Sequence, residues 1–265
     1  GEDIARFAKL NQHDDLDTIC RRYRQQIKLS FDRLKEQIDS PASVPFDKHY
    51  RYALQSLCWD ADYLLDLHSS TNRAVDYLYC FRDRQDSARY FLLDWAVLVY
   101  DYDGDAFDEA FIKPWLALEK ELHFLGKDIR FDIESWTLEL GSGMTIDPHS
   151  VDSGIRGIKN YFAAKGMLKL PGFPLAETDS HKMKFVDRQG ILKYHAPRGG
   201  TIEFCVKLGD KVSENQLLYR LLVLNKQGKL PDRLDIRAAR SGMVIDMAIN
   251  HSANQGEYVL SVLHP

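Results

Sequence analysis

Residues 131–143, FDIESWTLELGSG, are followed by residues 150–168, SVDSGIRGIKNYFAAKGML. The first stretch is rich in apolar and β-favouring residues and ends in glycines, which predicts a strand. The second has a helical pattern and ends at Gly166, a residue type that often terminates helices. A strand followed by a helix is typical of a layered α/β domain.

The sequence upstream repeats this alternation. Apolar side chains recur three or four residues apart on a charged background in residues 16–38, which predicts a helix. Further helices are expected at residues 47–59 and 107–125, and further strands at residues 61–70, 75–81 and 96–100. The chain up to about residue 170 is therefore expected to form a sheet flanked by helices.

The pattern changes near Phe185. Short alternating runs separated by turn pairs such as Gln227-Gly228 predict an all-β domain, so we expect one domain at residues 1–184 and another at 185–265. Residues 195–222 and 236–263 look like weak repeats, in which Ala196 with Gly200 matches Ala239 with Gly242. These repeats resemble the barrel-sandwich fold of lipoyl and biotinyl carriers.

A carrier function would require an exposed lysine at a hairpin tip. Lys226 and Lys229 lie in such a region, but they lack the flanking residues typical of a carrier. A closed β module that packs against a catalytic domain is the favoured interpretation.

Composition excludes several classes of function. The net charge of -4 is spread over both signs, so no basic face for nucleic acid is expected. No apolar run approaches the roughly 20 residues that cross a membrane. The four cysteines are widely spaced without a CxxC pair, which favours reduced thiols and a cytoplasmic protein.

Two polar residues stand at the ends of apolar strands. His68 follows ADYLLDL and could offer a ring nitrogen to a metal, although a structural histidine is an alternative. Glu139 lies between two leucines, where a solvated surface role is unfavourable. It could move protons in catalysis, or it could form a structural ion pair.

Together with the β domain, these segments resemble the succinylglutamate desuccinylase and aspartoacylase family of the zinc carboxypeptidase superfamily. The resemblance implies a zinc-carboxypeptidase-like mixed sheet flanked by helices, followed by a small barrel-sandwich domain. It implies that His68 is the third Zn²⁺ ligand and that Glu139 is the general base. The implied activity is zinc-dependent hydrolysis of the amide bond in an N-acyl amino acid or a similar small substrate, as in a carboxypeptidase-like deacylase.

One feature of the family is absent from the sequence. The first two zinc ligands are expected in a His-x-x-Glu segment, but none of the nine histidines has glutamate three positions later. We therefore expect the chain to begin partway through the catalytic domain. In its opening stretch, Arg6 and Asn11 are candidates for binding the substrate carboxylate, with helix capping as the alternative.

The missing ligands leave two functions open. One is the metal-dependent amide hydrolase, for which the activity of the 265-residue chain alone is undecided. The other is a non-catalytic binding protein that retains the hydrolase fold. The expected partner is a small molecule rather than nucleic acid or a membrane, and a homo-oligomer stays open.

Overall fold

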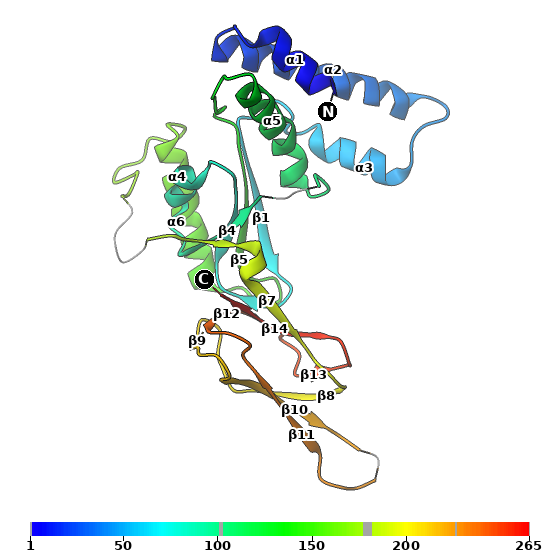
Figure 1. The fold of residues 1–265 in the computed structure, drawn as a ribbon, viewed down its shortest axis with the longest axis vertical. Helices are drawn as coiled ribbons and strands as arrows, with labels where there is room; N and C mark the ends of the chain where they lie inside the picture. The colour runs from blue at the N-terminus through cyan, green and yellow to red at the C-terminus, as the bar shows by residue number, and fades with distance from the viewer. Residues whose placement is uncertain (1, 101–102, 177–181, 226, 265) are drawn as a thin grey trace. The chain divides into compact units, whose positions relative to one another are not determined.

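The structure is a computed structural model that describes residues 2–100, 103–176, 182–225 and 227–264 (Figure 1). Its helices include α1 (Glu2–Asn11), α2 (Leu16–Asp39), α3 (Phe46–Gln55), α4 (Gln85–Ala88), η1 (Arg89–Phe91), α5 (Phe107–Phe124), α6 (Pro148–Ala164) and η3 (Arg188–Gly190). Its strands are β1 (Tyr63–Ser70), β2 (Arg73–Ala74), β3 (Tyr77–Phe81), β4 (Trp95–Val99), β5 (Glu134–Ser142), β6 (Lys184–Asp187), β7 (Ile191–His195), β8 (Gly200–Phe204), β9 (Lys211–Val212), β10 (Leu217–Val223), β11 (Asp232–Arg237), β12 (Gly242–Met247), β13 (Ser252–Ala253) and β14 (Tyr258–Leu263).

The chain divides into two compact units. The first joins Gly1–Asp66 with Asp101–Trp136, and the second joins Leu67–Tyr100 with Thr137–Pro265. The chain passes from one unit to the other within β1 and within β5, so the C-terminal ends of both strands belong to the second unit. The domain boundary expected from the sequence, between residues 184 and 185, does not coincide with this division into two units and stays a prediction.

Helices dominate the first unit. α2 begins after Asp15, whose carboxylate accepts a hydrogen bond from the Thr18 amide at 2.8 Å. Tyr23 of α2 packs edge-on against Trp115 of α5, with ring centroids 5.2 Å apart, and its hydroxyl donates to the Pro114 carbonyl at 3.0 Å. The helices expected at residues 16–38 and 107–125 are thus confirmed, and they share an aromatic core.

A mixed sheet runs in the order β1-β5-β3-β4-β6. β3, β4 and β6 are parallel neighbours, whereas β5 is antiparallel to β3. α6 starts after Asp147, which caps the His149 amide, and it ends just before Gly166, whose φ is +74°. The mixed α/β architecture predicted from the sequence is therefore present.

Helix α6 packs closely against η1. A Cβ added at Gly157 would lie 2.3 Å from the Phe91 carbonyl oxygen, and the Tyr161 and Phe91 rings stack with centroids 4.4 Å apart. The absence of a side chain at Gly157 lets the two backbones approach.

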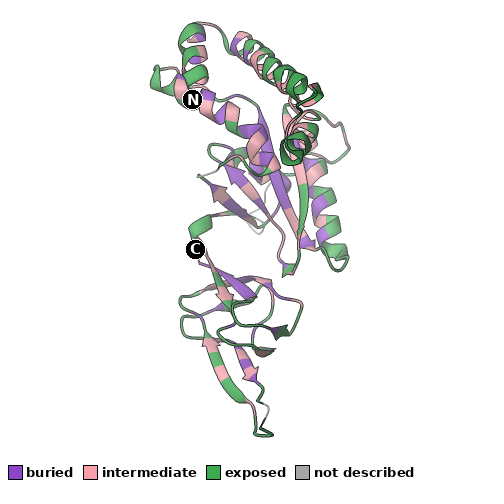
Figure 2. Ribbon diagram, turned by 90° about the vertical axis from the view of Figure 1, so that its right-hand side faces the viewer, coloured by how far each residue is buried: buried purple, intermediate pink, exposed green. Residues whose placement is uncertain are grey.

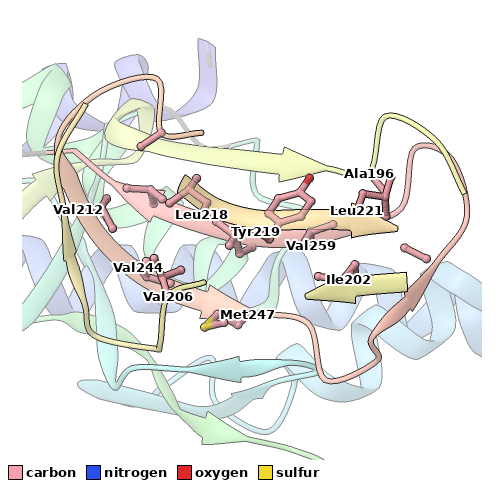
Figure 3. Packing of buried hydrophobic residues seen from close by; sticks show 14 of the residues in the cluster. Ala196, Ile202, Val206, Val212, Leu218, Tyr219, Leu221, Val244, Met247 and Val259 are labelled. Carbon is pink, nitrogen blue, oxygen red and sulfur yellow. The ribbon is translucent and has the colours of Figure 1, made fainter. Parts of the chain in front are cut away.

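The strands after β6 form two further sheets. One has the order β11-β10-β8-β13, and the other has the order β2-β12-β14-β7 with β9 beside β12. Their shared apolar core appears in Figure 3. Its fully buried members are Leu218, Tyr219, Leu221, Val244, Val259, Leu260 and Val262.

The two weak sequence repeats are visible as matching hydrogen bonds. Ala196 exchanges two backbone hydrogen bonds with the turn at residues 256–257, and Ala238 does the same with the turn at residues 215–216. The structural partner of Ala196 is therefore Ala238, one residue before the expected Ala239. The repeats also exchange short strands, because β9 pairs with β12 and β13 pairs with β8.

Burial follows the strands of the mixed sheet, whereas the outer surfaces of the helices are exposed (Figure 2). Over the described ranges, no helix is both long enough and apolar enough to cross a membrane. Lys229 is exposed after β10, and Lys226 lies outside the described residues.

Candidate active site

The two residues singled out on β1 and β5 lie close together in the second unit. Nδ1 of His68 is 3.9 Å from Oε1 of Glu139, and the exposed fractions of the two side chains are 50% and 15%. Leu138, the residue before Glu139, is buried. Because successive side chains of a strand alternate between faces, Glu139 is directed to the opposite face from Leu138. The structure therefore brings the imidazole and the carboxylate together, and their chemical roles stay predictions.

A second carboxylate, that of Asp76, is hydrogen-bonded to the end of β5. Asp76 accepts hydrogen bonds from the Gly141 amide and the Ser150 hydroxyl, and burial is the main cause that raises its pKa. Gly141 has a φ of +63°, and a Cβ there would lie 2.8 Å from Ser150 Oγ. These contacts fix the backbone two residues after Glu139.

A cavity of about 440 Å³ is lined by residues close to the pair on β1 and β3, and neither His68 nor Glu139 is among its lining residues. Ser70 lies on its wall, two residues after His68 on β1 and thus on the same face of that strand. Tyr77, also on the wall, is the register partner of Glu139 on β3. The complete lining is Ser70, Asn72, Tyr77, Tyr79, Arg188, Ile191, Lys193, His195, Ile245, Asp246, Tyr258 and Ser261.

Asp246 of β12 is the centre of a hydrogen-bond network in this cavity. Its Oδ2 accepts from Ser70 Oγ at 2.7 Å. Its Oδ1 accepts from Asn72 Nδ2 at 3.1 Å and from the Tyr258 hydroxyl at 2.6 Å, and that hydroxyl lies 2.9 Å from Ser261 Oγ. The network links the segment after His68 to strands β12 and β14.

Two tyrosines of the cavity, Tyr77 and Tyr258, have a raised pKa. Burial raises the pKa of Tyr77, and the hydroxyl of Tyr79 and the carboxylates of Glu139 and Asp246 raise it further. Burial also raises the pKa of Tyr258, with Asp246 as the next cause. Tyr77 is thus electrostatically coupled to both Glu139 and Asp246 and is available there as a neutral hydroxyl.

Asp246 was not predicted as a site residue, although the sequence carries a signal for it. Asp246 stands between Ile245 and Met247 in an expected strand, as Glu139 stands between two leucines. The same argument against a solvated surface role applies to both acids. Ser70 and Tyr77 carry no comparable signal, because hydroxyl and aromatic side chains are common in strands.

Arg6 and Asn11 both lie on α1 in the first unit. Asn11 is buried: its Nδ2 donates to the Phe7 carbonyl at 2.8 Å, and its Oδ1 accepts from Arg22 at 2.7 Å. Arg6 is exposed, and five residues of helix place the two side chains about 140° apart. The structure does not bring this pair together, and a contact of either residue with substrate stays a prediction.

The zinc expected from the resemblance would need three protein ligands. Within the described residues, no group of three or more His, Cys, Asp or Glu side chains is placed to hold a metal ion. His68 with Glu139 alone does not fit a zinc site.

The mixed sheet, with His68 beside Glu139 and a β domain after it, has the fold of the succinylglutamate desuccinylase/aspartoacylase family, which confirms the predicted resemblance. A protein of this family from Shewanella amazonensis matches with a TM-score of 0.83 and 26% identity, over 98% of this chain and 69% of its own. A structure of the same description from Shewanella frigidimarina gives a TM-score of 0.86 at 23% identity, over 99% and 68% of the two chains.

Among curated proteins, N-alpha-acetyl-L-2,4-diaminobutyric acid deacetylase from Halomonas elongata is 24% identical over 214 residues, which cover 75% of this chain. The match spans 55% of that relative, a little over half of its length. No family model matches the chain.

Proposed function

We propose that this chain carries the catalytic face of an amide hydrolase that acts on N-acyl amino acids or related small amides. The observation that carries the proposal is the approach of His68 Nδ1 to within 3.9 Å of Glu139 Oε1. The name of the curated relative, a deacetylase of an N-acetylated amino acid, supports the same chemistry.

In this proposal Glu139 is the general base. Its carboxylate takes a proton from water while the water oxygen adds to the carbonyl carbon of the amide. The C–N bond then breaks, and the proton passes from Glu139 to the leaving nitrogen, which gives a carboxylic acid and an amine. The side chain of Glu139 is only 15% exposed, which keeps most bulk water away from its carboxylate.

Zinc dependence is a further part of the proposal, with His68 as one ligand. Bound zinc supplies Lewis acidity and an activated water in such hydrolases. The side chains of the described residues do not complete a ligand set for zinc.

The remaining expectations follow from the resemblance. We propose a barrel-sandwich fold for the C-terminal β domain, which its exchanged short strands support. A cytoplasmic location and a homo-oligomer stay predictions. The non-catalytic binding protein is not favoured, because the relatives are named as deacylases and desuccinylases.

Two variants test the proposal with zinc in excess and an acetylated amino acid panel as substrate. Glu139→Gln is expected to lower kcat by about 10²- to 10⁴-fold, because the amide cannot accept the proton. His68→Ala is expected to lower kcat/KM by more than about ten-fold. Amino acid release is measured by a ninhydrin or coupled amine assay.

Glu203→Gln on β8 and His123→Ala on α5 are matched controls, because both side chains are exposed and lie outside the cavity. Both should retain wild-type rates. Full turnover by Glu139→Gln would refute the assignment of Glu139 as the general base.

A further inference from the structure

We infer that Tyr77 is a further catalytic residue, whose hydroxyl donates a hydrogen bond to the acyl oxygen of the substrate. This inference rests on the proposed function and deepens it. It adds the group that stabilises the negative charge formed on that oxygen when water attacks the amide.

The first observation is a row of side chains across three neighbouring strands. The mixed sheet has the order β1-β5-β3, so the strand of Glu139 lies between the strands of His68 and Tyr77. Glu139 and Tyr77 are register partners in an antiparallel pair, and such partners share one face of the sheet with Cβ atoms about 5 Å apart. Nδ1 of His68 lies 3.9 Å from Oε1 of Glu139. A carbonyl group held near the Glu139 carboxylate is therefore within reach of the phenol on β3.

The second observation is the hydrogen bonding of the Tyr77 hydroxyl. Among the described residues its one hydrogen-bond partner is the hydroxyl of Tyr79, with 3.4 Å between the two oxygens. Either hydroxyl can be the donor, but a single contact uses only one of the two protons. The other proton has no acceptor in the part of the chain that the structure describes. The pair thus offers one further hydrogen-bond donor to a ligand.

The register indicates which of the two tyrosines faces the reacting atoms. Tyr77 lies opposite Glu139, whereas Tyr79 lies opposite Thr137, two residues earlier on β5. The two tyrosine rings meet edge to face, with centroids 5.5 Å apart. In this arrangement Tyr79 donates to the Tyr77 oxygen, and the Tyr77 proton is left for the substrate. Tyr79 is therefore a positioning residue.

The third observation is the protonation state of the Tyr77 hydroxyl. Burial raises the pKa of Tyr77 above its ordinary value of about 10, and the Tyr79 hydroxyl and the carboxylates of Glu139 and Asp246 raise it further. The hydroxyl therefore keeps its proton at neutral pH, and Glu139 stays free to accept a proton from water. A neutral donor of this kind can stabilise an oxyanion without competing for the base.

The electrons and protons of the reaction can be followed atom by atom. As the water oxygen adds to the carbonyl carbon, Glu139 takes a water proton and the π electrons of the C=O bond move onto the acyl oxygen. That oxygen becomes negative, so the hydrogen bond from Tyr77 strengthens. When the C–N bond breaks, the electron pair on oxygen re-forms the C=O bond, and the proton on Glu139 passes to the nitrogen. Tyr77 keeps its own proton throughout.

Isotope-edited infrared spectroscopy tests this hydrogen bond without turnover. The Glu139→Gln chain is mixed with the acetylated amino acid panel, each member labelled with ¹³C at the acetyl carbonyl. Loss of the donor in Glu139→Gln/Tyr77→Phe is expected to move the band of the bound carbonyl to higher wavenumber. Glu139→Gln/Tyr90→Phe is the matched control, because Tyr90 is 38% exposed, and its band should not move. Identical bands with and without the Tyr77 hydroxyl, or no bound band with any ligand, overturn the inference.

Kinetic measurements separate catalysis from packing. Tyr77→Phe is expected to lower kcat by about 10²- to 10³-fold with a much smaller change in KM, because the hydrogen bond is strongest in the transition state. Tyr79→Phe should lower kcat less, because Tyr77 keeps its proton. Tyr90→Phe should retain the wild-type kcat. An unchanged kcat in Tyr77→Phe would show that the phenol only fills space.

The fold should survive the test substitutions. Phenylalanine keeps the ring, and the rings of Tyr77 and Tyr79 pack against a buried cluster made of Val97, Val186, Ile245 and Leu263. Thermal unfolding of Tyr77→Phe should therefore match that of the wild-type chain.

The two readouts distinguish this inference from the proposed function. A band shift caused by Tyr77→Phe supports the inference even where the wild-type chain does not hydrolyse the ligand. Hydrolysis by the wild-type chain, together with identical bands and full kcat in Tyr77→Phe, supports the proposed function and overturns the inference.

Discussion

Asp76 links protonation to the fold at the scale of a single residue. Its Oδ1 is buried with no hydrogen-bond partner among the described atoms, and burial is the leading cause that raises its pKa. When folding raises the pKa of a carboxyl group, protonation of that group stabilises the folded state. Its contribution to stability is fully present below the unfolded pKa, near 4, and is lost as the pH rises through the folded value.

We therefore expect Asp76→Asn to stabilise the chain at neutral pH. The amide oxygen can still accept from the Gly141 amide and the Ser150 hydroxyl, but no charge is buried. The gain in Tm over wild type should be larger at about pH 7 than at about pH 3, which lies below the unfolded pKa. Thermal unfolding followed by circular dichroism across this range measures it.

The matched control is Asp187→Asn, because the Asp187 side chain is exposed and caps only η3. The Tm difference between Asp187→Asn and wild type should not increase as the pH rises. A Tm difference for Asp76→Asn that is the same at both ends of the pH range would contradict the assignment.

Single residues also show what the sequence could and could not predict. His68 and Glu139 were predicted through a local pattern, an acid or an imidazole at the end of an apolar strand, and through the family resemblance that connected them. Asp246 carries the same local pattern. Its importance depends on Ser70 and Asn72, more than 170 residues away in the chain, and no local pattern indicates such a contact.

At the scale of elements, the end of β5 depends on Gly141. We expect Gly141→Ala to cost about 1–3 kcal/mol of unfolding free energy from the positive φ alone, with an added cost from the Ser150 contact. Gly126, after α5, is the matched control: its φ is +80°, but an added Cβ would meet no atom within 4 Å. Urea unfolding should show that Gly141→Ala is the more destabilising variant.

Because Gly141 also holds the backbone near Glu139, its substitution should reduce turnover more than Gly126→Ala does. Equal losses of stability in the two alanine variants would show that Ser150 moves aside without cost. In that case the contact does not constrain β5.

Elements were predictable where the chain repeats a pattern over several turns or residues. α2, α5 and α6 were expected from periodic apolar residues and a terminal glycine, and β1, β3, β4 and β5 from apolar runs. The two-residue strands β2, β9 and β13 were not, because they exist only through pairing with distant strands. β6 looks like the β domain in sequence but pairs with β4 in the mixed sheet.

At the scale of the whole molecule, metal binding tests whether the chain itself provides a complete ligand set. We expect the 265-residue chain to retain well below one zinc per chain after dialysis, because one imidazole beside one carboxylate is a weak donor set. His68→Ala should retain still less. Atomic emission after dialysis against metal-free buffer measures both.

His123→Ala serves as the control, since His123 is exposed on α5. One zinc per wild-type chain would show that three donors converge in solution, contrary to their placement in the described residues.

The cavity lined by Asp246 could not be predicted from the sequence. It exists because β2, which follows the segment after His68, pairs with β12, so that Ala74 lies opposite Asp246.

The exchange of short strands between the two repeats has a consequence for biosynthesis. Neither repeat can finish its own sheet, because β9 hydrogen-bonds to β12 and β13 to β8. The interior also needs Val259 and Leu260 of β14, which are fully buried. While the ribosome is still translating the second repeat, the apolar residues of the first repeat remain exposed. Cotranslational folding of this domain is therefore delayed until β14 has left the exit tunnel.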